Sequence, residues 1–471
     1  MLYSRYFNIL ILCFFFCGQV FLIPSQAFFN LGDFGIKEEK EMGRKFEVLI
    51  RSKLPLVEDP EVALYVKSIV QRISNVIPPQ PFHFTSGIIL HNALNAFAVP
   101  GGHIFIFTGL IMQLDNEAEL AGIIAHEMAH VTQRHVADRI NRGKYLGLAS
   151  LLLAIAGIAA GGGGEGGAVL ATGAIGVGQA AMLNYSRADE TDADDIGYQY
   201  LIAAGYPPLG MVGGFKKIRE KSFMTGGGGL PTYLSTHPAI DARITSALAK
   251  AHSEPPSLAK RQINNARFKR VQLLLWARYG NINVAKHRFS LTNDALSLMG
   301  RAMVFARENK IQEADNLFNK AILIKPTDAL ILREAGIFHY KKGNTSKAEQ
   351  YLIKAMELEP SDYMAQFFYA RLLDTTKRSQ MALPYYQKVL KILPQDTEVN
   401  IAYARSLANS GKKFLAYLYL SYGYLYSNHE KKTEQYRDKA DKLAKGQQEK
   451  KLLKKFDKIY KERKEIWEEG L

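Results

Sequence analysis

The stretch AELAGIIAHEMAHVTQRHVADR, residues 118–139, decides the fold of the first half of the chain. Its apolar residues recur at helical spacing and it contains no proline, so we predict one helix over residues 118–139. Positions four apart share a helix face, so the imidazoles of His126 and His130 can bind one metal ion. Glu127 lies between them, where it can serve as a general base. This spacing indicates a zinc site.

A second polar stretch supports the metal hypothesis. YSRADETDADDIG, residues 185–197, places Glu190 and Asp194 one helical turn apart. Catalytic zinc usually takes three protein ligands, and a ligand histidine usually donates its other N–H to an outer partner. Glu190 can be the third ligand, with Asp189 and Asp192 as the next candidates, and Asp194 can be the outer partner. His135 is interpreted as a structural or outer residue.

The pattern HEMAH followed by E-x-x-A-D resembles the gluzincin peptidases of the HtpX and CAAX-prenyl-protease type. Two further segments, NAFAVPGGHIFIFTGL (95–110) and LSTHPAIDAR (234–243), together with carboxy-terminal repeats, are similar to BepA-like periplasmic zinc metalloproteases with chaperone-like activity. The resemblance covers residues from about 36 to the end. It implies an α+β zincin-like metalloprotease domain, mostly helical with a small sheet.

The resemblance also implies the roles of individual residues. One Zn²⁺ per chain would be bound by His126, His130 and Glu190, with Glu127 as base and Asp194 assisting catalysis. His237, in the STHP segment, matches a histidine that can approach the zinc and restrain activity. The alternative is a fixed histidine that binds substrate or steadies the intermediate.

The second half of the chain is repetitive. Residues recur every 34 positions in four columns: Pro326, Pro360 and Pro394; Ala314, Ala348, Ala382 and Ala416; Phe318, Leu352, Tyr386 and Leu420; Ala302, Gly336, Ala370 and Ala404. This period, with small residues where helices touch, predicts tetratricopeptide repeats. Such repeats stack into an all-α solenoid whose concave face binds peptides or partner proteins.

These patterns divide the chain. We predict a signal peptide at 1–27, a metalloprotease domain at 28–252, a linker with a degenerate helix pair at 253–290, repeats at 291–430 and basic capping helices at 431–471. The amino-terminal segment has Arg5, an apolar run to about Ile23 and a cleavage site after Ala27; the alternative is a retained anchor. Both cysteines lie in it, so the mature chain would lack disulfides, and a periplasmic location fits.

Two segments flank the predicted site. Residues 146–183 are apolar and glycine-rich, and we predict a mobile lid there; the alternative is a membrane-inserted hairpin, although each arm is shorter than the roughly 20 residues needed. A second glycine run, 226–229, precedes His237 and would let it move. Residues 81–110 predict two or three short strands, with a turn at Gly101 and Gly102. By resemblance, strand 103–107 borders the cleft and offers its edge to an extended substrate; the alternative is an internal hairpin.

The net charge of +15 is not gathered into a nucleic-acid motif, so no nucleic-acid partner is expected. The densest basic cluster, residues 431–464, is mixed with acids and predicts a solvated helix face; attraction to an anionic membrane or an acidic partner is the alternative. No glycine run has the Lys-Ser/Thr of a phosphate loop, which argues against nucleotide binding.

Two functions fit. The first is a zinc-dependent metalloendopeptidase of the bacterial periplasm that cleaves misfolded or stalled envelope proteins and assists outer-membrane protein assembly through its repeats. The second is a mainly non-catalytic chaperone or assembly scaffold with a latent, self-inhibited zinc site. The expected partners are polypeptide substrates and the outer-membrane assembly machinery, with peripheral membrane association.

Overall fold

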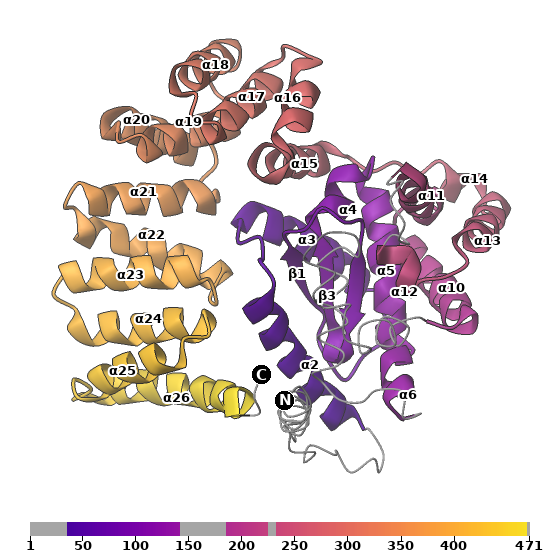
Figure 1. Ribbon diagram of the computed structural model, residues 1–471, viewed down its shortest axis with the longest axis horizontal. Helices are drawn as coiled ribbons and strands as arrows, with labels where there is room; N and C mark the ends of the chain where they lie inside the picture. The colour runs from indigo at the N-terminus through magenta and orange to yellow at the C-terminus, as the bar shows by residue number, and fades with distance from the viewer. Residues whose placement is uncertain (1–34, 142–184, 225–231, 469–471) are drawn as a thin grey trace, which may run out of the picture.

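The computed structural model describes residues 35–141, 185–224 and 232–468. The predicted signal peptide, the predicted lid and the glycine run 226–229 lie outside these residues. The described chain forms an α+β part followed by a curved array of paired helices (Figure 1). Within the described ranges, no helix combines the length and apolarity needed to cross a membrane.

The small sheet has three strands in the order β1-β3-β2. Strand β1 (Thr85–Ile89) runs parallel to β3 (His103–Phe107), and β2 (Ala96–Val99) runs antiparallel to it. The turn η1 (Pro100–Gly102) joins β2 to β3, and both of its glycines have positive φ, 79° and 90°, so the predicted strands and turn are confirmed. The expectation that β3 offers a free edge is wrong, because β3 is paired on both sides. The edge strands of the described sheet are β1 and β2, and Leu56 forms an isolated bridge to Ile89 on the outer side of β1.

Helices α2 (Ile36–Lys53) and α3 (Pro60–Ser74) precede the sheet, and α4 (Thr108–Gln113) follows it. Helix α5 (Glu117–Thr132) begins at the Asn116 cap and is buried from Ala118 to Val131, which places it in the centre of the domain. The prediction of one helix over 118–139 is wrong. Arg134 adopts a left-handed φ of 55°, and a second helix, α6 (His135–Asn141), begins at the next residue.

Four helices complete the amino-terminal part: α10 (Arg187–Ala203), α11 (Leu209–Met224), α12 (Thr232–Thr236) and α13 (Ile240–Ser253). Both α10 and α11 pack on α5. The approach of α10 is close at Gly197, where an added Cβ would lie 2.9 Å from the Cα of His126. This glycine lets α10 carry its carboxylates up to the histidines of α5.

The rest of the chain is helical. A short helix, α14 (Pro256–Ala259), leads into the pair α15 (Ala266–Tyr279) and α16 (Ile282–Ser290). Four helix pairs with the predicted period follow: α17 (Ala295–Arg307) and α18 (Ile311–Ile324); α19 (Ala329–Lys341) and α20 (Thr345–Leu358); α21 (Tyr363–Thr375) and α22 (Ser379–Ile392); α23 (Thr397–Asn409) and α24 (Lys413–Tyr426). Helices α25 (Glu430–Asp441) and α26 (Gln447–Glu468) close the array.

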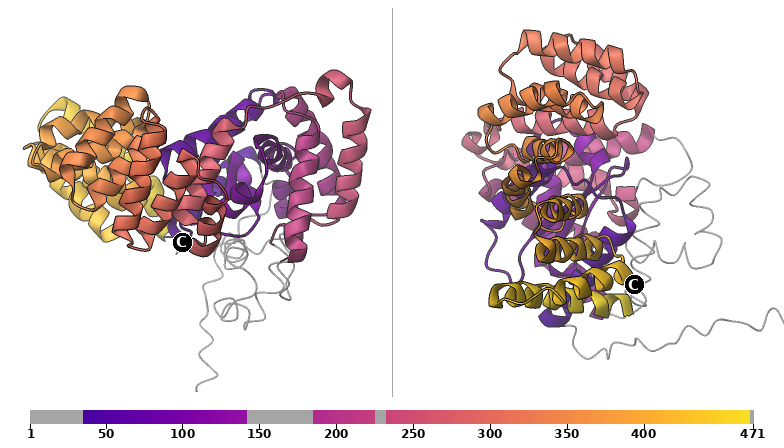
Figure 2. Two further views of the ribbon diagram at one scale, coloured as in Figure 1. Left: turned by 90° about the horizontal axis from the view of Figure 1, so that it is seen from above. Right: turned by 90° about the vertical axis from the view of Figure 1, so that its left-hand side faces the viewer.

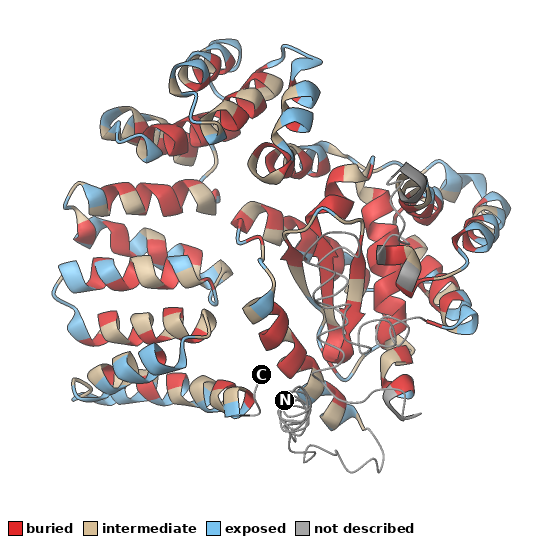
Figure 3. Cartoon of the chain, viewed as in Figure 1, coloured by how far each residue is buried: buried red, intermediate tan, exposed pale blue. Residues whose placement is uncertain are grey.

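The small residues of the repeat columns are buried between paired helices (Figure 3). At Gly336, an added Cβ would lie 2.8 Å from the Leu352 side chain, so α19 and α20 approach too closely for a larger residue. The two views in Figure 2 show the helix pairs stacked along one direction. The predicted α+β domain followed by an all-α repeat array is therefore confirmed.

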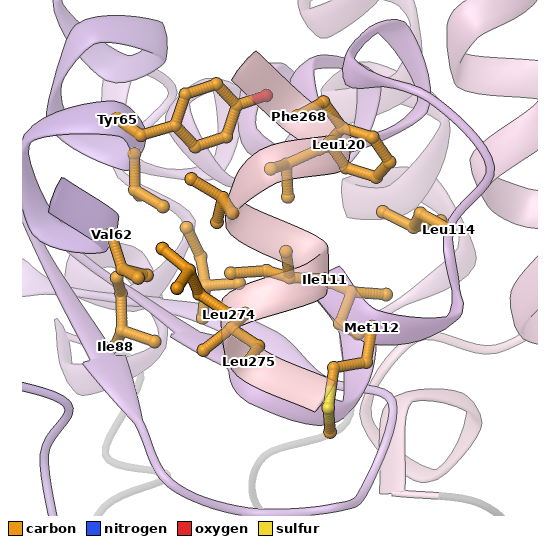
Figure 4. Close-up of a cluster of buried hydrophobic side chains, with 14 of the residues drawn as sticks. Val62, Tyr65, Ile88, Ile111, Met112, Leu114, Leu120, Phe268, Leu274 and Leu275 are labelled. Atoms are coloured by element: carbon orange, nitrogen blue, oxygen red, sulfur yellow. The ribbon is translucent and has the colours of Figure 1, made fainter. Parts of the chain in front are cut away.

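The two parts share a core. Helix α15 inserts Phe268, Leu274 and Leu275 among residues of α3, β1, α4 and α5 (Figure 4). Ion pairs also join them: Glu61 of α3 contacts Arg270 and Arg333, and the Arg333 side chain is 1% exposed. At the far end of the array, Glu462 of α26 lies 2.9 Å from Arg44 of α2. The array therefore curves so that both of its ends contact the amino-terminal part.

Candidate metal centre

Four side chains converge at the centre of the amino-terminal part. His126 and His130 come from α5, Glu190 from α10, and His237 from the residue after α12. Each offers one ligand atom, and these atoms all lie within 4.8 Å of one another. The four side chains are at most 1% exposed. The structure thus brings together all four residues that the sequence analysis nominated as ligands.

The facing atoms suit a cation. The Nε2 atoms of His126 and His130 lie 3.1 Å apart, and His130 Nε2 lies 3.4 Å from Glu190 Oε1. His237 Nδ1 lies 2.8 Å from the same Glu190 oxygen. Imidazole nitrogens and a carboxylate oxygen that converge within a buried space are the donors that Zn²⁺ takes in tetrahedral sites. The residues present therefore fit a zinc ion.

Outer partners orient the two helix histidines. His126 Nδ1 lies 2.9 Å from Asp194 Oδ1, so this nitrogen donates to the carboxylate and Nε2 is left to face the cluster. His130 Nδ1 lies 2.9 Å from His135 Nδ1, and His135 Nε2 lies 3.3 Å from Asp192 Oδ2. The break at Arg134 turns His135 back toward His130. The sequence analysis had given His135 only a general structural or outer role.

Glu127 points into the same buried region. It is completely buried, and neither carboxylate oxygen has a well-aligned hydrogen-bond partner among the described residues. Burial, and then the negative charge of Glu190, raise the pKa of Glu127 well above its ordinary value, although Arg243 and the nearby backbone of Ala98 oppose the shift. A carboxylate without a partner beside the cluster is a group that can accept and hold a proton.

Glu190 behaves in the opposite way. Burial alone would raise its pKa, but the charges of His237 and Arg243 and hydrogen bonds from His130 and His237 outweigh burial and hold the pKa well below its ordinary value. Glu190 is therefore an ionised oxygen ligand. The two glutamates of the site differ in charge because their neighbours differ.

Arg243 is a member of the site that the sequence analysis did not single out. Its guanidinium donates to both oxygens of Asp194, at 2.8 and 2.7 Å, and lies 2.5 Å from Glu190 Oε2. The guanidinium also lies over the Phe215 ring, 4.3 Å from its centroid. Its signal in the sequence was a cation at the end of the LSTHPAIDAR segment, six positions after His237, where several buried carboxylates need a counter-charge.

Two tyrosines that the sequence analysis did not single out as site residues pack against the histidines. Tyr185 stacks on His130 with ring centroids 3.7 Å apart, and Tyr233 stacks on His237 at 4.3 Å. The Tyr185 and His237 rings are 5.0 Å apart, so the four rings form one continuous pile. The backbone N–H of Tyr185 also donates to the Thr236 carbonyl. This packing holds His237 at the metal-ligating cluster.

Comparisons with known proteins agree with this geometry. Residues 60–251 match peptidase family M48, and residues 267–424 match a tetratricopeptide repeat family. The "Beta-barrel assembly-enhancing protease" of Yersinia pestis is 31% identical over 253 residues, which are 50% of this chain and 49% of that protein. The Escherichia coli (strain K12) protein of the same name is 28% identical over 348 residues, 69% of this chain and 67% of its own length.

The match to the first of these relatives spans about half of its length. Among solved structures, MamA covers 33% of this chain and 87% of its own, with 16% identity and a TM-score of 0.28, which is too low to define a common fold. The family matches confirm the predicted resemblance to metalloproteases that carry carboxy-terminal tetratricopeptide repeats, and residues 36–253 are called here the peptidase domain.

Proposed function

We propose that this chain, which carries a peptidase family M48 domain followed by tetratricopeptide repeats and is homologous to the beta-barrel assembly-enhancing proteases, is a zinc-dependent metalloendopeptidase. One observation carries the proposal. The buried carboxylate of Glu127, which has no well-aligned hydrogen-bond partner among the described residues, lies beside a cluster of three imidazoles and one ionised carboxylate. A metal used only for folding would not need a general base next to it.

Each residue has a defined task in peptide hydrolysis. His126, His130 and Glu190 would bind the zinc ion, with one per chain. When bound, zinc supplies Lewis acidity that lowers the pKa of a water molecule toward 7 and polarises a carbonyl. Glu127 accepts the proton of the attacking water and passes it to the leaving amine, which its raised pKa favours. Asp194 and Arg243 keep His126 and Glu190 in position.

An extended substrate would add to β2 rather than to β3. Strand β2 is one of the two edge strands of the described sheet, and α5, which carries the two histidines, packs against it. Backbone hydrogen bonds along a strand edge bind a polypeptide with little dependence on its side chains. This mode suits a protease that acts on unfolded segments of many proteins.

The substrates that we propose are misfolded or stalled envelope proteins of the bacterial periplasm. The name of the relatives refers to assembly of β-barrels, and the repeats provide a protein-binding array. We propose that the array engages the outer-membrane assembly machinery, and that residues 1–27 act as the signal peptide that exports the chain. Peripheral association with the membrane fits the net charge of +15.

A self-inhibited state is the second candidate, and the position of His237 favours it. A fourth protein ligand would occupy the place of the catalytic water. His237 lies in the ligand cluster, 3.6 Å from Glu127 Oε1 through Nε2, and is stacked on Tyr233. In this state the protein would serve mainly as a chaperone or assembly scaffold until His237 is displaced.

The test is metal analysis and casein cleavage with the purified chain. Glu127→Gln should retain stoichiometric zinc and lose cleavage, since the base is removed while the ligands remain. Glu313→Gln makes the same chemical change at an exposed position of α18 and should cleave like the parent. Loss of zinc in Glu127→Gln, or unchanged proteolysis, would show that the base is a different residue.

A further inference from the structure

The last helix of the array carries a row of unpaired cations. Six lysines of α26 are exposed and are called here the lysine face: Lys450, Lys451, Lys454, Lys455, Lys458 and Lys461. At 100° per residue their positions span an arc of roughly 140° around the helix. Within the described part of the chain, none of the six forms an ion pair. The lysine face is therefore a concentration of positive charge on one side of one helix.

The acids of α26 do not neutralise this face over most of its length. Glu449 accepts hydrogen bonds from the backbone at the start of its own helix. Asp457 is turned toward α25, where it accepts two hydrogen bonds from Arg437. Glu462 pairs with Arg44 of α2. Glu465 and Glu468 are the exceptions, since both are exposed on the same side as the lysine face beyond its last member.

The opposite side of α26 explains its fixed orientation. Leu453 and Phe456 are at most 5% exposed and pack in a cluster with residues of α24 and α25. Among the described residues, no helix lies against the outer side of α26 (Figure 1). A terminal repeat needs a polar outer face for solubility, but solubility alone is met by mixed charges. The exposed charges of this face from Lys450 to Lys461 are all positive, which favours contact with anions over a role in solubility alone.

We propose that the lysine face docks the protein on the surface of an anionic phospholipid bilayer. The ammonium group is a compact, hydrated point charge without the planar fork that recognises individual carboxylates or phosphates. A row of such groups suits the spread negative charge of a lipid surface better than the shaped site of a protein partner. The arc holds no apolar side chain for insertion, so the attraction is electrostatic and reversible.

Docking through the lysine face would set the orientation of the whole molecule at the membrane, because α26 contacts both the repeat array and the amino-terminal part. Its buried side packs on the array, and its Glu462 forms an ion pair with Arg44 of α2 in the amino-terminal part. A protein bound through the lysine face therefore holds its peptidase domain at the membrane surface. This inference deepens the proposed peripheral association with the membrane, and it holds whether or not the metal centre hydrolyses peptides.

The test compares two variants of the full chain with equal net charge. Lys451, Lys454, Lys455 and Lys458 are changed to Gln in the first, and Lys320, Lys354, Lys391 and Lys412, which are exposed and spread over the repeats, in the second. Each set lowers the net charge from +15 by 4, to +11. Co-sedimentation is measured with phosphatidylcholine vesicles, with and without phosphatidylglycerol. Vesicles of phosphatidylcholine alone report any binding that does not depend on lipid charge, including binding through residues 1–34.

The parent and the second variant should bind the phosphatidylglycerol vesicles, and high salt should release them. The first variant should bind at least about a hundredfold more weakly, since each lysine near an anionic surface contributes about fivefold. Circular dichroism checks that all three proteins are folded. An equal loss of vesicle binding in the two variants would show that binding depends only on net charge, and this result would overturn the proposal. Binding of heparin or polyglutamate without binding of the vesicles would overturn it in favour of an acidic macromolecule.

Discussion

The Nδ1 atoms of His130 and His135 lie 2.9 Å apart, so a ligand histidine of the candidate metal centre has a second histidine as its outer partner. The other nitrogen of His135 reaches Asp192, which is partly exposed. The contact exists because the chain turns at Arg134, where α5 ends and α6 begins. His126 has the more usual arrangement, with the carboxylate of Asp194 as its partner.

Replacing His135 should weaken zinc binding while the fold persists. His135→Phe removes the group that fixes the tautomer of His130, and loss of such a partner typically costs 10–100-fold in metal affinity. The measurement is competition for zinc against a chromogenic chelator. His252→Phe, at an exposed position of α13, is the matched control and should bind zinc like the parent. An unchanged zinc affinity in His135→Phe would show that the contact between His130 and His135 serves packing and does not tune metal binding.

Replacing Glu190 should weaken zinc binding more than replacing Asp194. Glu190→Ala removes a ligand atom from the cluster, whereas Asp194→Ala removes only the outer partner of His126. Both variants leave Arg243 without one of its carboxylates, so thermal melting must accompany the zinc titration. If Glu190→Ala binds zinc as tightly as the parent, Asp189 and Asp192 become the candidates for the third protein ligand.

Replacing His237 distinguishes a gate from a catalytic group. If His237 closes the site as a fourth ligand, His237→Ala should raise the rate of casein cleavage. Tyr233→Leu should also raise the rate of casein cleavage, but by less, because the Tyr233 ring stacks on His237 and supports its position. A fall in turnover at constant zinc content in His237→Ala would rule out the gate and favour a role in binding substrate.

The stability of the protein should depend on pH through the ionisation of Asp396. This residue caps α23 and lies against Glu58 of the segment before α3. Burial, and then the charge of Glu58, raise the pKa of Asp396 to about 8. In an unfolded chain the pKa is about 3.9. A folded-state pKa above the unfolded value means that the stabilising contribution is complete below about pH 4 and is lost as pH rises through about 8.

The Asp396→Asn variant keeps an oxygen that can accept the Val399 N–H and removes the charge. Its Tm relative to the parent should therefore rise between about pH 6 and about pH 9. Asp328→Asn, which changes the corresponding cap of α19, should show no such trend. A Tm difference for Asp396→Asn that is the same at both pH values would contradict the assigned cause.

Regular features were predictable from the sequence because they depend on local spacing. The period of 34 residues, the i,i+4 pairs His126/His130 and Glu190/Asp194, and the glycine turn before β3 all follow from short-range geometry. The break at Arg134 was missed, since arginine is a good helix former and the apolar spacing continues through it. A tertiary contact favours the break, because the Arg134 side chain donates a hydrogen bond to Glu39 of α2 at 2.9 Å.

The order of strands and the role of Arg243 required long-range contacts. A central strand and an edge strand of this length have the same composition, so the position of β3 between β1 and β2 was not visible. Arg243 is an ordinary helix residue in the sequence. Only the approach of α13 to α10 gives it two buried carboxylates to pair with. Contacts of this kind join residues almost fifty positions apart.

The position of α3 makes the peptidase domain and the repeat array mechanically inseparable. Its first turn pairs with Arg270 and Arg333, while Val62 and Tyr65 of the same helix belong to a hydrophobic cluster that extends as far as Phe338 in α19. Neither half can melt without exposing apolar surface of the other, so heating should produce one cooperative transition rather than two. A pulling force that a bound polypeptide exerts on the repeats would therefore be transmitted through α3 to α5, the helix that carries the metal-ligating histidines.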